Sequence, residues 1–140
     1  MKRVTLFILS LIFINCASDD TKPKDADEPL LGKWKIIERL VDPGDGSGTF
    51  QSIDSERTIE FFNNATVTVN GVMCYMATEV SSHTTGTYVS IFGSDFNDGE
   101  ITPPDCNYDG AKVWYKISGA NLILWYQCIE GCGEKYIKVN

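Results

Sequence analysis

Short runs of alternating apolar and polar residues fill the chain from Leu31 onward, and this pattern constrains the fold more than any other feature. A period of two puts successive side chains on opposite faces of a β-strand, and turn-forming residues interrupt the runs about every eight to twelve residues. No long segment shows a helical repeat. The pattern predicts a single all-β domain of about eight antiparallel strands. The expected strands cover residues 34–40, 49–53, 57–62, 65–69, 72–76, 85–92, 112–118, 122–128 and 136–139.

Two turns indicate which of these runs pair. Asn70-Gly71 favours the positive φ angles of a type I′ turn, so we expect a hairpin between 65–69 and 72–76. The strongest hairpin signal is Gly-Ala-Asn at 119–121, which joins the two apolar runs around it.

The first expected strand has an irregular alternation. Trp34, Ile36 and Leu40 are expected on one face and Arg39 on the other, although the apolar Ile37 interrupts the pattern. Two stretches rich in glycine, proline and acidic residues are expected to be loops, at 42–48 and 93–109.

Gly32-Lys33-Trp34, at the start of the first expected strand, resembles the Gly-x-Trp signature of the lipocalin fold. The later segments follow the order found in small lipocalin-like lipoproteins: Thr58-Ile59-Glu60-Phe61-Phe62, Tyr115-Lys116-Ile117, Leu122-Ile123-Leu124 and Glu134-Lys135-Tyr136. The resemblance covers residues 30–140 and implies a single antiparallel up-and-down barrel of about eight strands. It also implies that Trp34 plugs the closed end and that the barrel mouth holds a small apolar molecule.

Four cysteines lie in this domain: Cys74, Cys106, Cys128 and Cys132. In an exported protein they are expected to be oxidised, and four cysteines allow three pairings. A local bridge can span the short Ile-Glu-Gly segment between Cys128 and Cys132, so we favour this bridge together with Cys74–Cys106, while the other pairings stay open. A zinc site is disfavoured because the spacing lacks Cys-x2-Cys knuckles, and no metal or cofactor is expected.

The first fifteen residues have the layout of a bacterial export signal. Two basic residues precede an apolar run at 4–14, and Cys16 follows. A helix of that length reaches about 16 Å, well short of the roughly 30 Å hydrocarbon core of a membrane, so we do not expect it to span one. Phe13-Ile14-Asn15-Cys16 resembles the lipobox of bacterial lipoproteins. This resemblance implies a signal peptide at 1–15 and an acylated Cys16 that becomes the new N-terminus.

Residues 16–29 are expected to form a flexible acidic tether, because Asp, Lys, Thr and Pro dominate them without apolar periodicity. Asp19 and Asp20 resemble the surface-export signals of one large group of Gram-negative bacteria. We therefore expect a lipoprotein anchored in the outer membrane, and this resemblance implies exposure on the cell surface. The alternative is a short acidic linker that carries no localisation signal.

The formal net charge of the chain is −7, and it becomes −9 once the export signal with Lys2 and Arg3 is removed. A nucleic acid partner is excluded, since phosphate contacts need clustered Lys and Arg. We expect the acidity to keep an exposed, monomeric domain soluble.

No group of residues selects an enzymatic activity. His83 is the only histidine and stands in a polar connecting stretch, and no Gly-x-Ser-x-Gly motif accompanies it. The acidic segment 95–100 departs from the register of a calcium loop. Oxygen ligands without a defined pattern are also offered by Asp42, Asp45 and Ser47. We therefore expect a protein that is not an enzyme.

Trp114, Tyr115, Trp125 and Tyr126 all fall on the strongest predicted hairpin, on both of its faces. We expect Tyr115 and Tyr126 to fill the core and the tryptophans to line the outer wall; in the opposite register the tryptophans would line a cavity. A large aromatic side chain outside the core marks a contact surface, so these residues are candidates for ligand or partner contact.

Two functional hypotheses follow. The first is a lipid-anchored cell-envelope binding module that holds a small apolar or amphipathic ligand in its barrel. The second is a structural or interaction lipoprotein with a solid core, which contacts another envelope protein or an external macromolecule through its loops.

Overall fold

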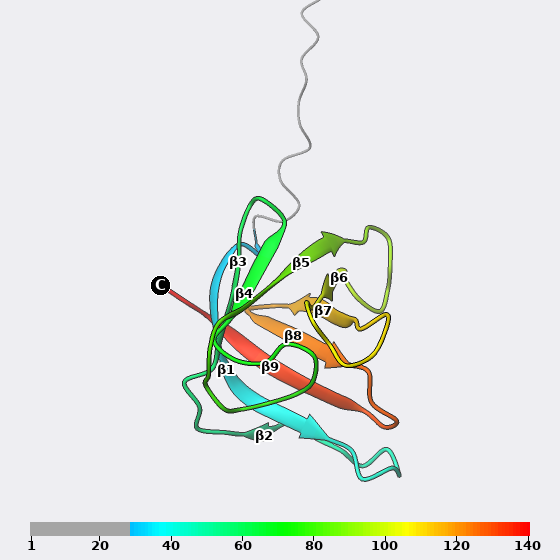
Figure 1. Ribbon diagram of the computed structural model, residues 1–140. Helices are drawn as coiled ribbons and strands as arrows, with labels where there is room; N and C mark the ends of the chain where they lie inside the picture. Colours follow the sequence, from blue (N-terminus) through cyan, green and yellow to red (C-terminus); the bar gives the residue numbers. More distant parts are fainter. Residues whose placement is uncertain (1–28) are drawn as a thin grey trace, which may run out of the picture.

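The computed structural model describes residues 29–140, and all of their regular secondary structure is β (Figure 1). Adjacent strands are antiparallel throughout, so the all-β prediction is confirmed. The strands are β1 (Gly32–Val41), β2 (Gln51–Ser52), β3 (Thr58–Phe61), β4 (Thr66–Val69), β5 (Thr84–Ser90), β6 (Gly99–Thr102), β7 (Val113–Ser118), β8 (Asn121–Tyr126) and β9 (Cys132–Val139).

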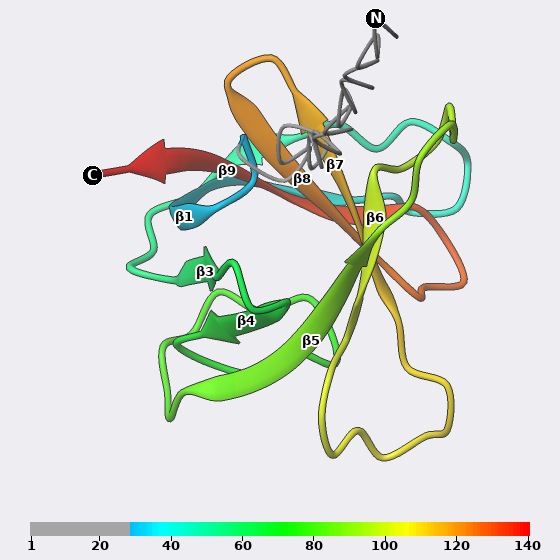
Figure 2. The same ribbon diagram turned by 90° about the horizontal axis from the view of Figure 1, so that it is seen from above.

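Eight of these strands close into an up-and-down barrel. Apart from β2, each strand pairs with its neighbours in chain order, and β9 pairs with β1 to complete the ring. The short strand β2 lies outside the ring and pairs with the second half of β1, where Glu38 is opposite Ser52. Seen from above, β3, β4 and β5 lie on one side and β7, β8 and β9 on the other (Figure 2). The architecture is the predicted lipocalin-like barrel, and β2 is an additional strand outside its ring.

Because the barrel is up-and-down, its connections alternate between two ends. The end at which Pro29 and Leu30 lead into β1 also carries the β3–β4 turn, the 91–98 loop and the β7–β8 turn, and we call it the N-terminal end. The far end carries the remaining loops. Two of them, between β1 and β2 and between β8 and β9, lie close together at the lower right of Figure 1. The far-end loops are 42–50, 70–83, 103–112 and 127–131.

Apolar side chains fill the interior of the barrel as one continuous buried cluster. Three aromatic rings, those of Phe61, Tyr88 and Tyr115, meet edge to face with centroids 5.2 to 6.3 Å apart. Such contacts add to the stability gained from burial alone. Trp34 is only 2% exposed, and its indole Nε1 donates a hydrogen bond to the carbonyl oxygen of Leu30 at 2.8 Å.

A β-bulge at Ile37 corrects the prediction for the first strand. The register between β1 and β9 shifts there, so the side chains that follow exchange faces. Arg39 therefore shares the inner face with its partner Glu134, and Leu40 shares the outer face with Gly133. The apolar residue that interrupts the alternation is the bulge itself.

The segment after Asn70 brings a second correction. Residues 72–76 form no strand, and β4 pairs with β5 instead. The Asn70 side chain bonds back to the start of β3, where its Oδ1 accepts the Thr58 N–H at 2.6 Å. Gly71 is not among the glycines with positive φ. Its smallness is needed for another reason, because an added Cβ would lie 2.6 Å from a guanidinium nitrogen of Arg57.

The loop expected at 93–109 is interrupted by β6, which pairs with β5 and β7. Gly99 opens this strand and has no room for a side chain, because Val89 O and the Tyr115 hydroxyl each lie 2.3 Å from its Cβ position. The strand covers only Gly99–Thr102 and two prolines follow it, so it shows too little alternation to be predicted from the sequence.

Two disulfides brace the far end with the pairing that we favoured. Cys74–Cys106 joins the 70–83 and 103–112 loops, with the Cα atoms 5.6 Å apart. Cys128–Cys132 spans the turn before β9, with the Cα atoms 6.2 Å apart.

We expect the two disulfides to contribute unequally to stability. Replacing Cys74 and Cys106 by serine opens a loop with a sequence separation of 32, against 4 for Cys128 and Cys132. The chain-entropy argument then gives losses of about 3 to 4 kcal/mol and about 2 kcal/mol. Urea unfolding of the two double variants beside the parent chain measures the difference. Equal losses would contradict the loop-length argument.

Candidate functional site

The predicted signal peptide, Cys16 and the tether up to residue 28 lie outside the described residues. Within residues 29–140 no helix is long and apolar enough to cross a membrane. In the same part of the chain, no three His, Cys, Asp or Glu side chains gather as ligands for a metal ion. His83 is exposed.

The four aromatic residues of the β7–β8 hairpin separate into two pairs, as the alternation predicts. Tyr115 and Tyr126 point into the barrel and are buried. Trp114 and Trp125 lie directly opposite each other on the outer wall and are half-buried. Gly119 in the connecting turn has a φ of 61°, which suits glycine.

Two further residues extend the tryptophan pair into an outer aromatic patch, defined as Phe50, Trp114, Trp125 and Lys135. The Phe50 ring meets the Trp125 ring edge to face, with centroids 5.8 Å apart. Lys135 Nζ lies 4.4 Å from the centroid of the Phe50 ring. The Trp125 ring covers Gly133 of β9, where an added Cβ would lie 2.8 Å from the ring. The patch therefore presents aromatic rings in fixed positions on the outside of the barrel.

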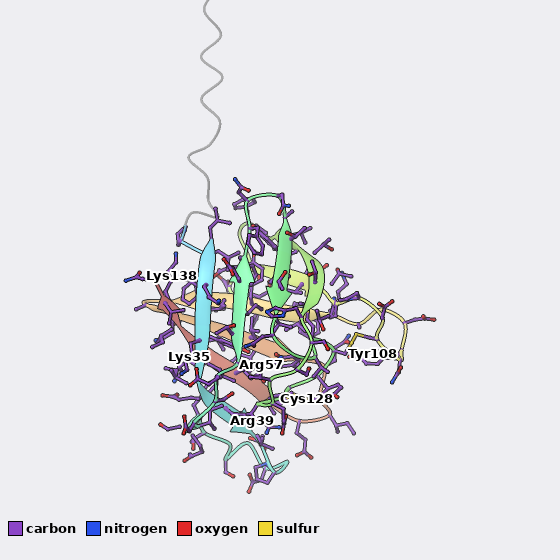
Figure 3. All side chains as sticks on the ribbon, turned by 60° about the vertical axis from the view of Figure 1, so that its left-hand side comes forward. Lys35, Arg39, Arg57, Tyr108, Cys128 and Lys138 are labelled. Carbon is purple, nitrogen blue, oxygen red and sulfur yellow. A yellow bond between two sulfur atoms is a disulfide. The ribbon has the colours of Figure 1, made fainter. Side chains whose placement is uncertain are left out.

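Four polar residues form a buried polar cluster inside the far end: Arg57, Tyr126, Glu134 and Tyr136. Arg57 is 1% and Glu134 0% exposed, and Arg57 is labelled near the centre of Figure 3. Glu134 Oε2 accepts hydrogen bonds from the hydroxyls of Tyr126 at 2.6 Å and Tyr136 at 2.5 Å. The same oxygen lies 3.8 Å from Arg57 Nε. Each buried charge thus has an opposite charge beside it, without which burial would be costly.

The cluster also holds the 70–83 loop across the far end of the barrel. The Ala77 N–H donates to Glu134 Oε1 at 2.9 Å, and Arg57 Nη2 donates to the Val72 carbonyl oxygen at 2.5 Å. Met73 and Ala77 of this loop are buried. The loop therefore closes the far end, with the charged pair beneath it.

Burial and charge shift the proton affinities in the cluster. Burial raises the pKa values of Tyr126 and Tyr136 well above that of an ordinary tyrosine, and the Glu134 charge raises them further. Burial alone would lower the pKa of Arg57, but Tyr136, Tyr126 and Glu134 outweigh it and raise this pKa above its ordinary value. The phenols therefore stay neutral and the guanidinium stays charged.

The sequence contains a signal for this cluster that the motif analysis missed. Arg57 stands two residues before Ile59, and Glu134 stands two residues before Tyr136. In a strand, side chains two residues apart point the same way. Ile59 and Tyr136 point into the barrel, so Arg57 and Glu134 are expected to point inward as well. A charged residue at such a position needs a buried partner, so the two could have been paired.

We expect the free energy of unfolding to fall as the pH rises above about 10, the ordinary pKa of tyrosine. In the unfolded chain Tyr126 and Tyr136 ionise there, whereas their raised pKa values keep both protonated in the folded chain. The folded state then binds more protons, so stability is lost by up to about 2.7 kcal/mol per pH unit for two groups. Phenolate absorbance during an alkaline titration should show that Tyr126 and Tyr136 ionise only when the chain unfolds. Tyr126→Phe should remove one tyrosine from this late step, and ionisation of Tyr126 and Tyr136 before unfolding would contradict the prediction.

The Asp42 carboxylate organises its own loop. Its Oδ1 accepts the N–H groups of Gly44 at 2.7 Å and Gly46 at 3.0 Å, and its Oδ2 accepts that of Gly48 at 2.9 Å. These backbone donors, Gly44 first, hold the pKa of Asp42 below its usual value. The oxygens that we considered as cation ligands are thus turned towards the backbone.

A hollow of about 310 Å³ opens at the N-terminal end. Its apolar lining includes Leu30, Phe92 and Ile117, and it is also lined by Ser90 and Tyr115, whose hydroxyls are 2.9 Å apart. This volume is at the lower limit of pockets that hold small molecules.

These features define an antiparallel β-barrel protein with a packed core, a buried polar cluster and an aromatic patch on its outer wall. A comparison of the chain with protein-family models, with curated proteins and with solved structures finds no match.

Proposed function

We propose that this chain is a lipid-anchored lipoprotein of the bacterial outer membrane whose barrel is a non-catalytic interaction module. The order of the basic start, the apolar run and Cys16 supports the anchor. Two disulfides in a small domain fit an exported protein, since such bonds persist in oxidising compartments. Asp19 and Asp20 after the cysteine support exposure on the cell surface.

The observation that carries the proposal is the distribution of aromatic side chains. Tyr115 and Tyr126 fill the interior, whereas Trp114 and Trp125 lie outside with Phe50. A filled interior favours the interaction protein over a barrel that encloses its ligand. Aromatic side chains are enriched in protein interfaces because each brings a large, rigid contact area.

The outer aromatic patch combines these rings with charges. Lys135 lies over the Phe50 ring and also pairs with Glu38, and Glu100, which faces Trp114 across β6 and β7, pairs with Lys112. A partner with both apolar and charged groups suits such a surface. We therefore propose another envelope protein or an external macromolecule as the partner of this patch.

Site-specific photocrosslinking in intact cells tests the patch. A photoreactive phenylalanine in place of Trp114 should yield a discrete adduct with another macromolecule. The same group in place of Thr85, an exposed position elsewhere on the outer wall, serves as the matched control. Identical patterns from both positions, or none from Trp114, would contradict the role of the patch.

A ligand-binding module remains the second candidate, favoured by the hollow at the N-terminal end. Native mass spectrometry of the chain extracted from membranes separates the two. We expect a polypeptide that begins at an acylated Cys16 and lacks the four protons of its two disulfides, without further mass. A retained small molecule that is lost on unfolding would favour the ligand-binding module, and an unmodified Cys16 would overturn the anchor.

A further inference from the structure

We propose that the N-terminal end of the barrel rests on the membrane and that the 91–98 loop inserts its phenylalanines into a phospholipid surface. This inference rests on the lipid anchor proposed above. It adds a second membrane contact, made by the folded domain itself.

The loop exposes large apolar side chains that the fold does not use. Phe92 is 78% and Phe96 86% exposed, and Ile91 beside them is 37% exposed. Keeping two aromatic rings in water is unfavourable, and contiguous exposed apolar side chains mark sites of protein or membrane contact. Aromatic residues are also enriched where proteins meet the membrane interface.

Hydrogen bonds hold this loop in a defined shape. The Ile91 N–H donates to the Asp98 carbonyl oxygen, and the Asp98 N–H donates to the Tyr115 carbonyl oxygen, each at 2.8 Å. Asp98 Oδ2 accepts the Ile117 N–H at 2.6 Å, and Ser94 Oγ accepts the Phe96 N–H at 3.3 Å. The two rings are therefore presented outward by an ordered turn.

The apolar surface continues from the loop into the end of the barrel. Phe92 and Ile91 line the hollow of about 310 Å³ together with Leu30 and Ile117. Pro29 also lines this hollow, so the surface lies where the chain enters the domain.

The chain before Pro29 joins a lipid on Cys16 to this end of the barrel. Twelve residues lie between the two positions, and a fully extended chain of that length spans at most about 45 Å. A lipid on Cys16 would therefore be attached to the same end of the barrel that carries the 91–98 loop.

The far end of the barrel is more acidic than the N-terminal end, which favours an orientation with the N-terminal end at the membrane. At the N-terminal end positive and negative side chains balance, with Lys33, Lys116 and Lys138 against Glu60, Asp95 and Asp98. The far-end loops carry one lysine, Lys112, which pairs with Glu100, against Asp42, Asp45, Glu79, Asp105, Asp109 and Glu130. Tyr75, Val80, Tyr108 and Ile129 are also exposed in the far-end loops, but these loops carry the six carboxylates as well. A negative membrane surface would repel the far end.

Photocrosslinking to lipid tests the orientation. The acylated protein is reconstituted in vesicles of phosphatidylcholine and phosphatidylglycerol with Phe96→benzoylphenylalanine, and the matched control is Tyr108→benzoylphenylalanine. Tyr108 is a half-exposed aromatic residue on the far end, away from β1 in Figure 3. We expect a lipid adduct in the mass spectrum from position 96 and none from position 108. Equal adducts from both, or an adduct of position 96 with a second copy of the protein alone, would overturn the proposal.

A second measurement separates this inference from the anchor. Hydrogen exchange of the 91–98 amides should be several-fold slower on vesicles than in detergent micelles, and Phe92→Ser with Phe96→Ser should abolish the difference. The acyl group on Cys16 is read from the N-terminal peptide of the same sample. An acylated chain without slowed exchange refutes the loop contact and leaves the anchor standing, whereas an unacylated chain refutes both.

Discussion

Replacement of Glu134 by leucine should lower the free energy of unfolding by about 3 to 5 kcal/mol, because it leaves the Arg57 guanidinium as an uncompensated charge inside the barrel. The phenols of Tyr126 and Tyr136 and the Ala77 N–H lose their acceptor at the same time. Urea unfolding of the disulfide-bonded protein measures the loss. A decrease below about 1 kcal/mol would show that the pair is not held as described.

A double-mutant cycle provides the control for Glu134. Arg57→Met alone should also destabilise the barrel, since it leaves the Glu134 carboxylate unpaired. Arg57→Met combined with Glu134→Leu should lose less than the sum of the single changes, because two apolar side chains of similar size leave no charge behind. Additive losses would mean that Arg57 and Glu134 do not interact.

Trp34→Ala should cost about 3 to 5 kcal/mol, because the cavity left by a buried tryptophan is only partly refilled. Trp34 is 2% exposed, belongs to the buried apolar cluster and is hydrogen-bonded to Leu30. Urea unfolding again gives the number. A loss below about 1 kcal/mol would refute the role of this residue as the plug of the barrel.

Two matched variants separate packing from hydrogen bonding at Trp34. Trp34→Phe keeps most of the ring but removes the bond from Nε1 to Leu30 O, so it should cost about 1 to 3 kcal/mol. Trp114→Ala removes a half-buried tryptophan of the outer wall and should cost less than Trp34→Ala. If Trp34→Ala and Trp114→Ala lower the free energy of unfolding equally, the burial of Trp34 inside the barrel does not make it more important for stability.

Much of the barrel follows from the period of two. The alternation in β7 and β8, the glycine turn between them and the inward Tyr115 and Tyr126 were all predicted. In these strands one face is buried and the other is exposed to solvent. The alternation of apolar and polar residues is therefore clear in the sequence, and it determines the register. Spacing favoured the observed disulfide pairing, because Cys128 and Cys132 are close enough for a local bridge, but it left the other pairings open.

The remaining features depend on contacts between distant segments. Asn70-Gly71 satisfies the rule for a hairpin turn, yet Asn70 bonds to Thr58 and Gly71 makes room for Arg57. The alternation in each strand indicates that Arg57 and Glu134 face inward, but the distance between them across the barrel is known only from the fold. The outer patch needs Phe50 from the β1–β2 loop, which was not among the predicted contact residues.

The seam between β1 and β9 bears on how this chain reaches its folded state. It joins the first and last strands over eight residue pairs, from Lys33 with Val139 to Val41 with Cys132. Pairing between residues so distant in sequence slows folding, because much of the chain must be ordered before these contacts form. The seam forms only after β9, the last strand of the domain, has been synthesised, so we expect no closed ring in a chain that is still incomplete.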